Sequence, residues 1–228
     1  MKPVITPADT ELVKKSKEVL FVSGIDTNVG KTYATAALAN TLLQNGYNVI
    51  TQKLIQTGCI GSSEDIEKHR EIMGIPMQEV DKKGLTCPLI LSYPASPHLA
   101  AEIDKKEIDI DKATDATGKL LESYDVVLLE GAGGLMVPIS SDSNMELGGY
   151  LTIDYIQDHN YPLILVTSGK LGSLNHTLLS IEACMRRKIE IRAIIYNLYP
   201  DSDRIITESS LEYLKNLGIP VATLQNLE

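Results

Sequence analysis

The feature that most constrains this chain is a glycine-containing turn between a short apolar run and an alanine-rich segment. The run "VLFV" covers residues 19–22, the turn ends in Gly30-Lys31-Thr32, and the alanine- and leucine-rich segment covers residues 31–46. A strand, a Gly-Lys-Thr turn and a helix together form the context of a phosphate-binding loop, in which backbone N–H groups converge on phosphate oxygens. The stretch therefore predicts a nucleotide site.

The Gly-Lys-Thr sequence has defined physical roles in such a loop. We expect Lys31 to bridge the β- and γ-phosphates and the Thr32 hydroxyl to bind Mg²⁺. The spacing departs from the strict motif, because Gly24 and Gly30 enclose five residues, "IDTNV", whereas G-x-x-x-x-G-K-[ST] encloses four. The chain therefore carries a longer variant of the loop.

Similar apolar runs recur along the chain and alternate with segments that favour helices. The predicted strands cover residues 19–22, 48–51, 125–130, 162–167 and 191–197. The predicted helices cover residues 31–46, 64–74, 111–124, 147–160, 173–188 and 204–218. Runs rich in Val, Ile and Leu without strict alternation are typical of strands buried on both faces of a parallel sheet.

This alternation predicts an α/β fold: one P-loop NTPase-like domain over residues 1–228, with a mostly parallel central sheet and helices on both faces. Residues 82–98 are rich in proline and are expected to form an irregular connection with one short strand. Residues 1–17 suggest an N-terminal helical extension, since Thr6 would suit an N-cap and Pro7 a first helical position.

Composition limits the classes of partner. The formal net charge is −9, which disfavours general binding to nucleic acid or to an anionic membrane. Cys59, Cys87 and Cys184 form no Cys-x-x-Cys pair, a pattern typical of free thiols in a reducing cytosol. The first residues contain no apolar core of a signal peptide, and no apolar run approaches the roughly 20 residues of a membrane helix. We therefore expect a cytoplasmic protein.

Polar residues at the ends of other predicted strands are candidates for the same site. Lys53 lies at or just beyond the end of the second predicted strand, and ligands of open α/β sheets collect outside the carboxyl ends of the strands. Taken alone, Lys53 could also be a solvated lysine, and Asp65 could be an acid that favours the first turn of its helix. Ser96 and Pro97 read as the N-cap and first residue of a further helix.

A second strong motif follows the strand at 125–130. Glu130 ends that strand and precedes Gly131-Ala132-Gly133-Gly134. An acidic residue at the end of a strand beside a phosphate loop meets Mg²⁺ directly or through water. The glycines are expected to leave room for phosphate or substrate against bare backbone. Asn197 ends another predicted strand, and its amide could read an adenine edge.

Taken in order, these motifs resemble those of dethiobiotin synthetases. "GIDTNVGKT" (24–32) resembles the longer loop of that family, and "EGAGG" (130–134) and "KLGSLNH" (170–176) match further family motifs. The resemblance covers residues 20 to about 200. It implies a Mg²⁺- and ATP-dependent ligase of biotin biosynthesis that closes a ring by forming C–N bonds. Its substrates would be 7,8-diaminononanoate and CO₂, and dethiobiotin would form through a carbamate and a carbamic–phosphoric anhydride.

The resemblance also implies roles for individual residues. Catalysis would involve Lys53, Lys31 and Thr27. Mg²⁺ would be held by Thr32, Asp65 and Glu130. The nucleotide would contact Asn28, Val29, Gly30, Lys31, Thr32, Tyr33, Asp65, Glu130, Gly131, Ala132, Gly133 and Asn197. The substrate would contact Thr27, Lys53, Thr57, Pro97, Gly172, Ser173, Leu174 and Asn175.

The last four substrate positions imply a homodimer. The resemblance places the substrate carboxylate at this helix N-terminus of the partner subunit, where free N–H groups can bind it. Asn175 and His176 could instead be capping or core residues. The longer front half of the phosphate loop would bring Thr27 toward the acceptor.

Several positions depart from the family pattern. Leu54 replaces the usual proline after Lys53, and the family's pocket tyrosine has no clear counterpart near Ser209 or Tyr213. Only "TLQNLE" remains at the end of the sequence to complete contacts with the base. Two further residues keep an alternative interpretation, because Glu64 adjoins Asp65 and His98 is either a general base or, more simply, a packing residue.

Two other function classes fit a phosphate loop. A partitioning ATPase of the deviant Walker A class carries a signature lysine five residues before the Gly-Lys-Thr lysine, and this position is Asp26 here. Such ATPases also need a surface for DNA or membrane, which the negative charge disfavours. A regulatory nucleotide-binding domain with a dead active site is the second alternative. The presence of Lys31, Thr32, Lys53 and Glu130 argues against it.

Overall fold

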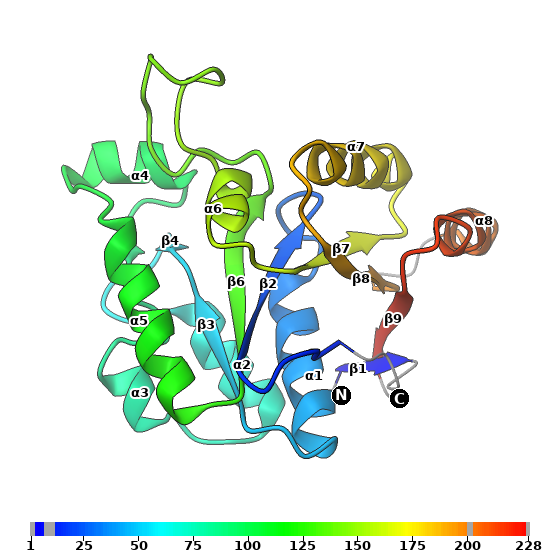
Figure 1. The fold of residues 1–228 in the computed structure, drawn as a ribbon, viewed down its shortest axis with the longest axis horizontal. Helices are drawn as coiled ribbons and strands as arrows, with labels where there is room; N and C mark the ends of the chain where they lie inside the picture. The colour runs from blue at the N-terminus through cyan, green and yellow to red at the C-terminus, as the bar shows by residue number, and fades with distance from the viewer. Residues whose placement is uncertain (1–2, 7–11, 200–202, 227–228) are drawn as a thin grey trace.

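The recurrent apolar runs form the strands of one central sheet in the computed structural model, which describes residues 3–6, 12–199 and 203–226 (Figure 1). The sheet contains β1 (Pro3–Thr6), β2 (Glu18–Gly24), β3 (Val49–Lys53), β6 (Val126–Gly134), β7 (Leu163–Ser168), β8 (Ile191–Asn197) and β9 (Val221–Asn226). Their order is β1-β9-β8-β7-β2-β6-β3. Only the β1–β9 pair is antiparallel within this described sheet, so the predicted mostly parallel sheet is confirmed.

Helices cover both faces of the sheet, and the strands are buried on both sides. On β2, Phe21 belongs to one apolar cluster, whereas Leu20 and Val22 belong to the other. The same alternation holds along β6, β7 and β8, because successive side chains of a strand point to opposite faces. This two-sided burial explains why the runs do not alternate between apolar and polar residues.

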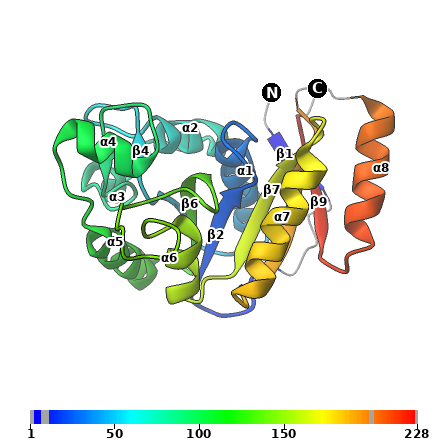
Figure 2. The same cartoon turned by 90° about the horizontal axis from the view of Figure 1, so that it is seen from above.

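The two clusters are completed by different helices. One cluster contains residues of α1 (Lys31–Gln44) and α2 (Glu64–Met73). The other contains residues of α4 (Pro97–Asp104), α5 (Ile110–Ser123), α6 (Thr152–Asp158), α7 (Ser173–Arg186) and α8 (Arg204–Lys215). In Figure 2, α1 and α2 lie on the side of the sheet opposite α5, α6 and α7. Beyond the edge strand β3 lie α3 (Glu79–Lys82) and the small parallel pair β4 (Gln56–Thr57) and β5 (Ile90–Leu91).

The strand order determines where a ligand can bind. The chain builds β3 and β6 on one side of β2 and then crosses to build β7 on the other side. A reversal of this kind leaves a crevice outside the carboxyl ends of the strands, where open α/β sheets bind ligands. The phosphate loop begins at the carboxyl end of β2 and therefore lies at this crevice.

Two predictions about elements were wrong, and one strand was missed. Pro3–Thr6 form a strand rather than a helix, residues 12–17 are not helical, and the proposed first helical residue Pro7 lies outside the described residues. The helix expected at 147–160 begins only at Thr152. Leu151 precedes it in extended backbone, pairs with Pro138 and donates its N–H to Asp154 Oδ2 at 3.0 Å. The last strand, β9, was not predicted.

A buried ion pair fixes α2 against the sheet. Arg70 Nε donates to Asp81 Oδ2 at 2.9 Å, its Nη2 donates to Asp81 Oδ1 at 2.7 Å, and its Nη1 donates to Thr51 Oγ1 at 2.7 Å. The side chains of Arg70 and Asp81 are 2% and 1% exposed. Burial alone would raise the pKa of Asp81, but the hydrogen bonds from Arg70 and Thr86 outweigh it and lower the pKa. The pair therefore stabilises the fold while Asp81 is ionised.

We expect Asp81→Asn to lower the free energy of unfolding at neutral pH by about 3 kcal/mol, because it leaves the Arg70 charge buried without a partner. The pKa of Asp81 is lower in the folded than in the unfolded state. Its contribution is therefore present above the unfolded pKa of about 4 and is lost as the pH falls through the folded pKa. Urea unfolding of both proteins at several pH values measures the difference, which should shrink in acid.

The matched control is Glu79→Gln on the same short helix. Glu79 pairs with Lys82 at 2.6 Å, but both side chains are exposed, and exposed pairs contribute little to stability. The account would be contradicted if the two substitutions lowered the free energy of unfolding equally. It would also be contradicted if the loss caused by Asp81→Asn did not change with pH.

Candidate active site

The turn after β2 curls so that its backbone can face an anion. Asn28 and Gly30 have φ angles of 60° and 96°, a backbone conformation that favours glycine and tolerates asparagine. A Cβ atom on Gly30 would collide with the side-chain amide of Asn197. Lys31 begins α1, and its Nζ donates to the Asp26 carbonyl at 2.9 Å. The loop therefore has the positive φ angles and the adjoining helix N-terminus that an anion-binding loop requires.

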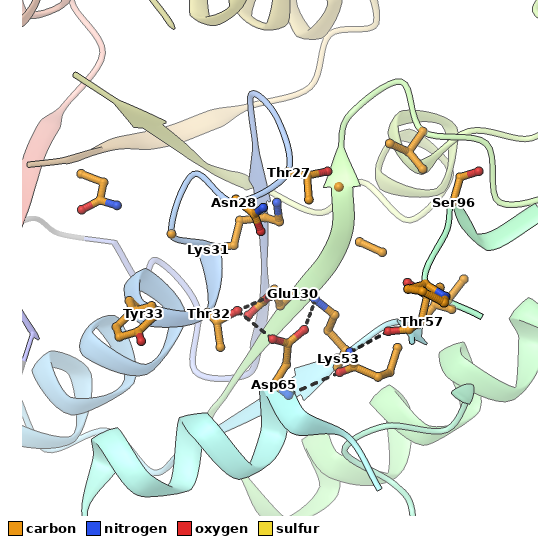
Figure 3. Close-up of a pocket in the computed structure, with 18 of the residues that line it drawn as sticks. Thr27, Asn28, Lys31, Thr32, Tyr33, Lys53, Thr57, Asp65, Ser96 and Glu130 are labelled. Carbon is orange, nitrogen blue, oxygen red and sulfur yellow. Dashed lines mark hydrogen bonds and ion pairs between the residues drawn. The ribbon is translucent and has the colours of Figure 1, made fainter. Parts of the chain in front are cut away.

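A second lysine lies across the crevice between two carboxylates (Figure 3). Lys53 Nζ lies 2.8 Å from Glu130 Oε1 and 2.6 Å from Asp65 Oδ2, and it also donates to the Gly131 carbonyl at 3.1 Å. The pairing of β3 with β6 explains the contact, because Lys53 and Glu130 are register partners. Lys53 is 5% exposed and Glu130 is fully buried.

The electrostatics of this cluster keep Lys53 and Glu130 ionised. Burial alone would lower the pKa of Lys53, but the charges of Glu130 and Asp65 outweigh it and raise the pKa. Burial alone would raise the pKa of Glu130, but the charge of Lys53 and a hydrogen bond from His69 outweigh it and hold the pKa well below its usual range. The ammonium and the carboxylate therefore persist across the physiological pH range.

Three oxygen-bearing side chains meet beside the phosphate loop. Thr32 Oγ1 lies 2.9 Å from Asp65 Oδ1 and 3.2 Å from Glu130 Oε1. Hard oxygen ligands of this kind suit Mg²⁺, which in nucleotide sites binds one or two carboxylates together with substrate phosphates and water. Among the described residues, no group of three or more His, Cys, Asp and Glu could hold a metal by itself. The arrangement thus fits a nucleotide-bound Mg²⁺ rather than a metal held by protein alone.

The pKa of Lys31 is lowered to about 8, first by burial and then by the nearby charge of Lys53. We expect the affinity for ADP, measured without Mg²⁺, to fall as the pH rises above this value. The fall should approach tenfold per pH unit, because neutral Lys31 must take up a proton to engage a phosphate. Titration calorimetry in buffers of different ionisation enthalpy should detect this uptake. Lys31→Arg, which stays charged, should abolish it, and an affinity that does not change with pH would contradict the expectation.

The phosphate loop and the Lys53 cluster face one cleft of about 1080 Å³. Most of the residues predicted for the site line it: Thr27, Asn28, Gly30, Lys31, Thr32, Tyr33, Lys53, Thr57, Asp65, Pro97, Glu130, Ala132, Gly133 and Asn197. They come from β2, β3, β4, β6, β8 and the starts of three helices, or from the loops beside them. Residues far apart in the sequence are therefore brought to one edge of the sheet.

Two predicted nucleotide contacts are not among the residues that line the cleft. Val29 is buried beneath the loop, where its side chain occupies the space that a Cβ on Gly24 would need. Gly131 is also buried, and a Cβ there would press on the ring of Phe21. The need for glycine at position 131 thus comes from core packing, whereas Gly133 does line the cleft.

Other candidates lie away from this cleft in the described structure. Gly172, Ser173, Leu174 and Asn175 at the start of α7 do not line it, and neither do His176, His98, Ser209 and Tyr213. Of the neighbouring acids at the start of α2, Asp65 lines the cleft, whereas Glu64 is exposed and does not line it. Ser96 lines the cleft and is the N-cap residue of α4, although its side chain makes no capping hydrogen bond.

One end of the cleft was not predicted in detail. Asn197 donates to the Val29 carbonyl and accepts from the Tyr199 N–H, both at 3.0 Å. Within the described residues, each end of its amide makes one hydrogen bond, and each end has the capacity for a second. Beyond it the wall consists of Tyr199, Leu224, Gln225 and Pro3. Pro3 reaches this edge because β1 runs antiparallel to β9.

Two buried polar residues that support the site were also missed. The Gln56 side chain accepts from Ser63 Oγ at 2.7 Å and from the Asp65 N–H at 3.4 Å, and so it fixes the start of α2. His69 contacts Glu130 from the next turn of that helix. The i, i+4 spacing of Asp65 and His69 was the available signal, since such residues share a helix face.

A scan against family models matches residues 18–224 to an AAA domain. Curated relatives are similar over most of the chain. The "ATP-dependent dethiobiotin synthetase BioD 2" of Pasteurella multocida is 50% identical over 198 residues, which is 87% of this chain and 90% of that protein. The protein of the same name from Haemophilus influenzae is 52% identical over 84% of this chain and 96% of that protein. The "ATP-dependent dethiobiotin synthetase BioD" of Chlorobaculum tepidum is 49% identical over 86% of this chain and 80% of that protein.

Solved structures with low sequence identity share the fold. Chloroplast FtsY from Physcomitrella patens superposes with a TM-score of 0.52 at 18% identity, over 98% of this chain and 66% of that chain. A ParA family ATPase from Chlorobium tepidum superposes with a TM-score of 0.51 at 19% identity, over 91% of this chain and 83% of that chain. At such identities the likeness shows the fold alone.

Among the helices that the structure describes, none has the length and hydropathy that a membrane crossing requires.

Proposed function

The chain belongs to the dethiobiotin synthetase family of ATP-dependent ligases, and from this premise we propose how its cleft performs the reaction. The enzyme converts 7,8-diaminononanoate, CO₂ and ATP into dethiobiotin, ADP and phosphate. The observation that carries the assignment to this cleft is the position of Lys53. It lies between Glu130 and Asp65 in the same cleft as the Gly-Lys-Thr loop, so one site can hold both the nucleotide and an anionic acceptor.

The chemistry begins with the diamine. One amine adds to CO₂ and loses a proton, which gives a carbamate. A carbamate oxygen then bonds to the γ-phosphorus as the bond to ADP breaks, which gives a carbamic–phosphoric anhydride. The second amine attacks the carbonyl carbon, closes the ureido ring and releases phosphate. Each step depends on positioning and charge neutralisation more than on covalent help from the protein.

The residues of the cleft divide between the two reactants. Lys31 and the loop N–H groups bind the β- and γ-phosphates. Lys53, with Thr27 and Thr57 nearby on the cleft wall, faces the acceptor. Thr32, Asp65 and Glu130 would hold Mg²⁺, which offsets charge on the phosphates. The two lysines clamp the carbamate against the γ-phosphate in the proposed complex.

The far end of the cleft is proposed to bind the base. Asn197 retains one donor and one acceptor position there, and Tyr199 provides an aromatic surface that is 65% exposed. An aromatic face can stack on a nucleobase. The edge strands β9 and β1 would thus contribute further contacts to the base.

A homodimer in the cytoplasm is the proposed working form. Gly172, Ser173, Leu174 and Asn175 do not line the cleft of their own chain in the described structure. The N-terminus of the 14-residue helix α7 presents free N–H groups and a partial positive charge. In the proposed dimer this helix end receives the substrate carboxylate at the partner's cleft.

The alternative functions predict a different dependence on substrate. A partitioning ATPase would turn over ATP without the diamine, although Asp26 stands where that class has a lysine. The test follows ADP release with ATP and Mg²⁺ while the diamine and bicarbonate are omitted in turn. Release that requires both compounds supports the proposal. Turnover that ignores the diamine, or that DNA stimulates, would contradict it.

A further inference from the structure

A fully buried histidine on α2 contacts the acidic residue at the centre of the cleft. His69 Nε2 lies 2.8 Å from Glu130 Oε2, and both side chains are 0% exposed. His69 itself is not among the residues that line the cleft. Its direct contact with the cleft is therefore made through Glu130.

The two oxygens of Glu130 have different partners. Oε1 accepts from Lys53 Nζ at 2.8 Å and from Thr32 Oγ1 at 3.2 Å. Oε2 is the atom that meets His69. A hydrogen bond at Oε2 fixes the rotation of the carboxylate about its last side-chain torsion, which is otherwise broad. This rotation decides whether Oε1 faces Thr32 and Lys53.

The position of His69 is itself rigid. Ser63 caps α2 by accepting from the Ile66 N–H at 3.2 Å, and the next residue, Arg70, binds Thr51 of β3 and Asp81. His69 follows Asp65 by one helical turn, so a single helix carries a carboxylate of the cleft and the partner of the other carboxylate. Movement of α2 would displace both.

The other ring nitrogen shows that the histidine is not simply a structural bridge. Nδ1 of His69 is buried and has no hydrogen-bond partner in the described part of the chain. An unsatisfied buried polar atom lowers stability. A residue chosen only for packing would be apolar here, so the contact with Glu130 is what the histidine provides.

We propose that His69 is a positioning residue that orients Glu130, so that Glu130 Oε1 and Thr32 Oγ1 together receive nucleotide-bound Mg²⁺. In this arrangement His69 Nε2–H donates to Oε2, and Oε1 is left for the cleft. The inference rests on the proposed nucleotide site and concerns the step before any chemistry. A histidine that orients a metal-binding carboxylate typically changes metal affinity by about 10–100-fold when it is removed.

The test compares His69→Leu with His69→Gln. Glutamine can place an amide N–H near the position of Nε2, whereas leucine cannot donate. Binding of a fluorescent ADP analogue is titrated with Mg²⁺ in the absence of diamine and bicarbonate. We expect His69→Leu to raise the Mg²⁺ concentration for half-maximal tightening at least tenfold and to leave Mg²⁺-free binding unchanged. His69→Gln should restore most of the Mg²⁺ response.

His159→Leu is the control, since His159 stacks on Tyr161 and bonds to the Tyr155 carbonyl at the end of α6. An unchanged Mg²⁺ response in His69→Leu would overturn the proposal, as would a His69→Gln protein that is as impaired as His69→Leu. If the leucine variant does not fold, His69→Asn, whose amide is too short to reach Glu130, replaces it in the same comparison. Because no substrate is present, the outcome is independent of whether the diamine is the true substrate.

Discussion

Replacement of Lys53 by glutamine is expected to slow dethiobiotin formation about 10²–10³-fold, while nucleotide affinity stays within about threefold. Glutamine keeps much of the side-chain length but removes the charge that lies 2.8 Å from Glu130 and 2.6 Å from Asp65. Loss of one preorganised charge-stabilising group typically lowers kcat about 10²–10³-fold. Product formation by mass spectrometry and ADP binding by calorimetry measure the two effects separately.

The same substitution should also show how much Lys53 contributes to the stability of the fold. Without the ammonium, Glu130 and Asp65 face each other near one point, so we expect the melting temperature to fall as well. Lys119→Gln on the exposed face of α5 is the matched control, and it should change neither property. Unchanged turnover in Lys53→Gln would show that Lys53 takes no part in the mechanism. Loss of ADP binding would show that Lys53 binds the nucleotide rather than the acceptor.

Replacement of Glu130 by glutamine is expected to cause a loss of similar size by a different route. The substitution retains the shape of a fully buried side chain, but it removes the charge that Thr32, Lys53 and His69 surround. We expect kcat to fall about 10²-fold or more and the Mg²⁺ requirement to rise. Steady-state turnover measured over a range of Mg²⁺ concentrations distinguishes these two changes.

Glu67→Gln is the control for this second substitution. Glu67 lies on α2 close in sequence to Asp65, and it is exposed. Its neutralisation should leave the Mg²⁺ dependence unaltered. If Glu130→Gln kept the full Mg²⁺ response, Glu130 would not belong to the metal site, and the ion pair with Lys53 would be its sole role.

The phosphate loop and the central strands could be predicted because their signals are local. The strand of residues 19–22, the glycine turn and the Gly-Lys-Thr helix start lie within a few residues of one another. The strands are buried on both faces, so they read as continuous apolar runs. Lys53 and Glu130 could be identified as candidates because each lies at or just beyond the end of such a run, at the edge where ligands bind.

The remaining features depend on contacts between distant segments. The strand Pro3–Thr6 exists because it pairs with β9 at the other end of the chain, and no local pattern indicates that pairing. The Lys53–Glu130 contact follows from the register of β3 against β6. Gly131 was assigned to ligand contact, but its need for glycine comes from Phe21 in a strand more than a hundred residues earlier. His69 on a helix is equally consistent with a core or surface position.

The most direct test of the central claim follows the oxygen atoms. If a carbamate oxygen attacks the γ-phosphorus, then bicarbonate labelled with heavy oxygen must transfer one labelled atom to the released phosphate. A short single-turnover reaction in ordinary water, with the phosphate analysed by mass spectrometry, measures this transfer. The account predicts labelled phosphate and dethiobiotin in equal amounts. Unlabelled phosphate, formed when water attacks ATP, would contradict it.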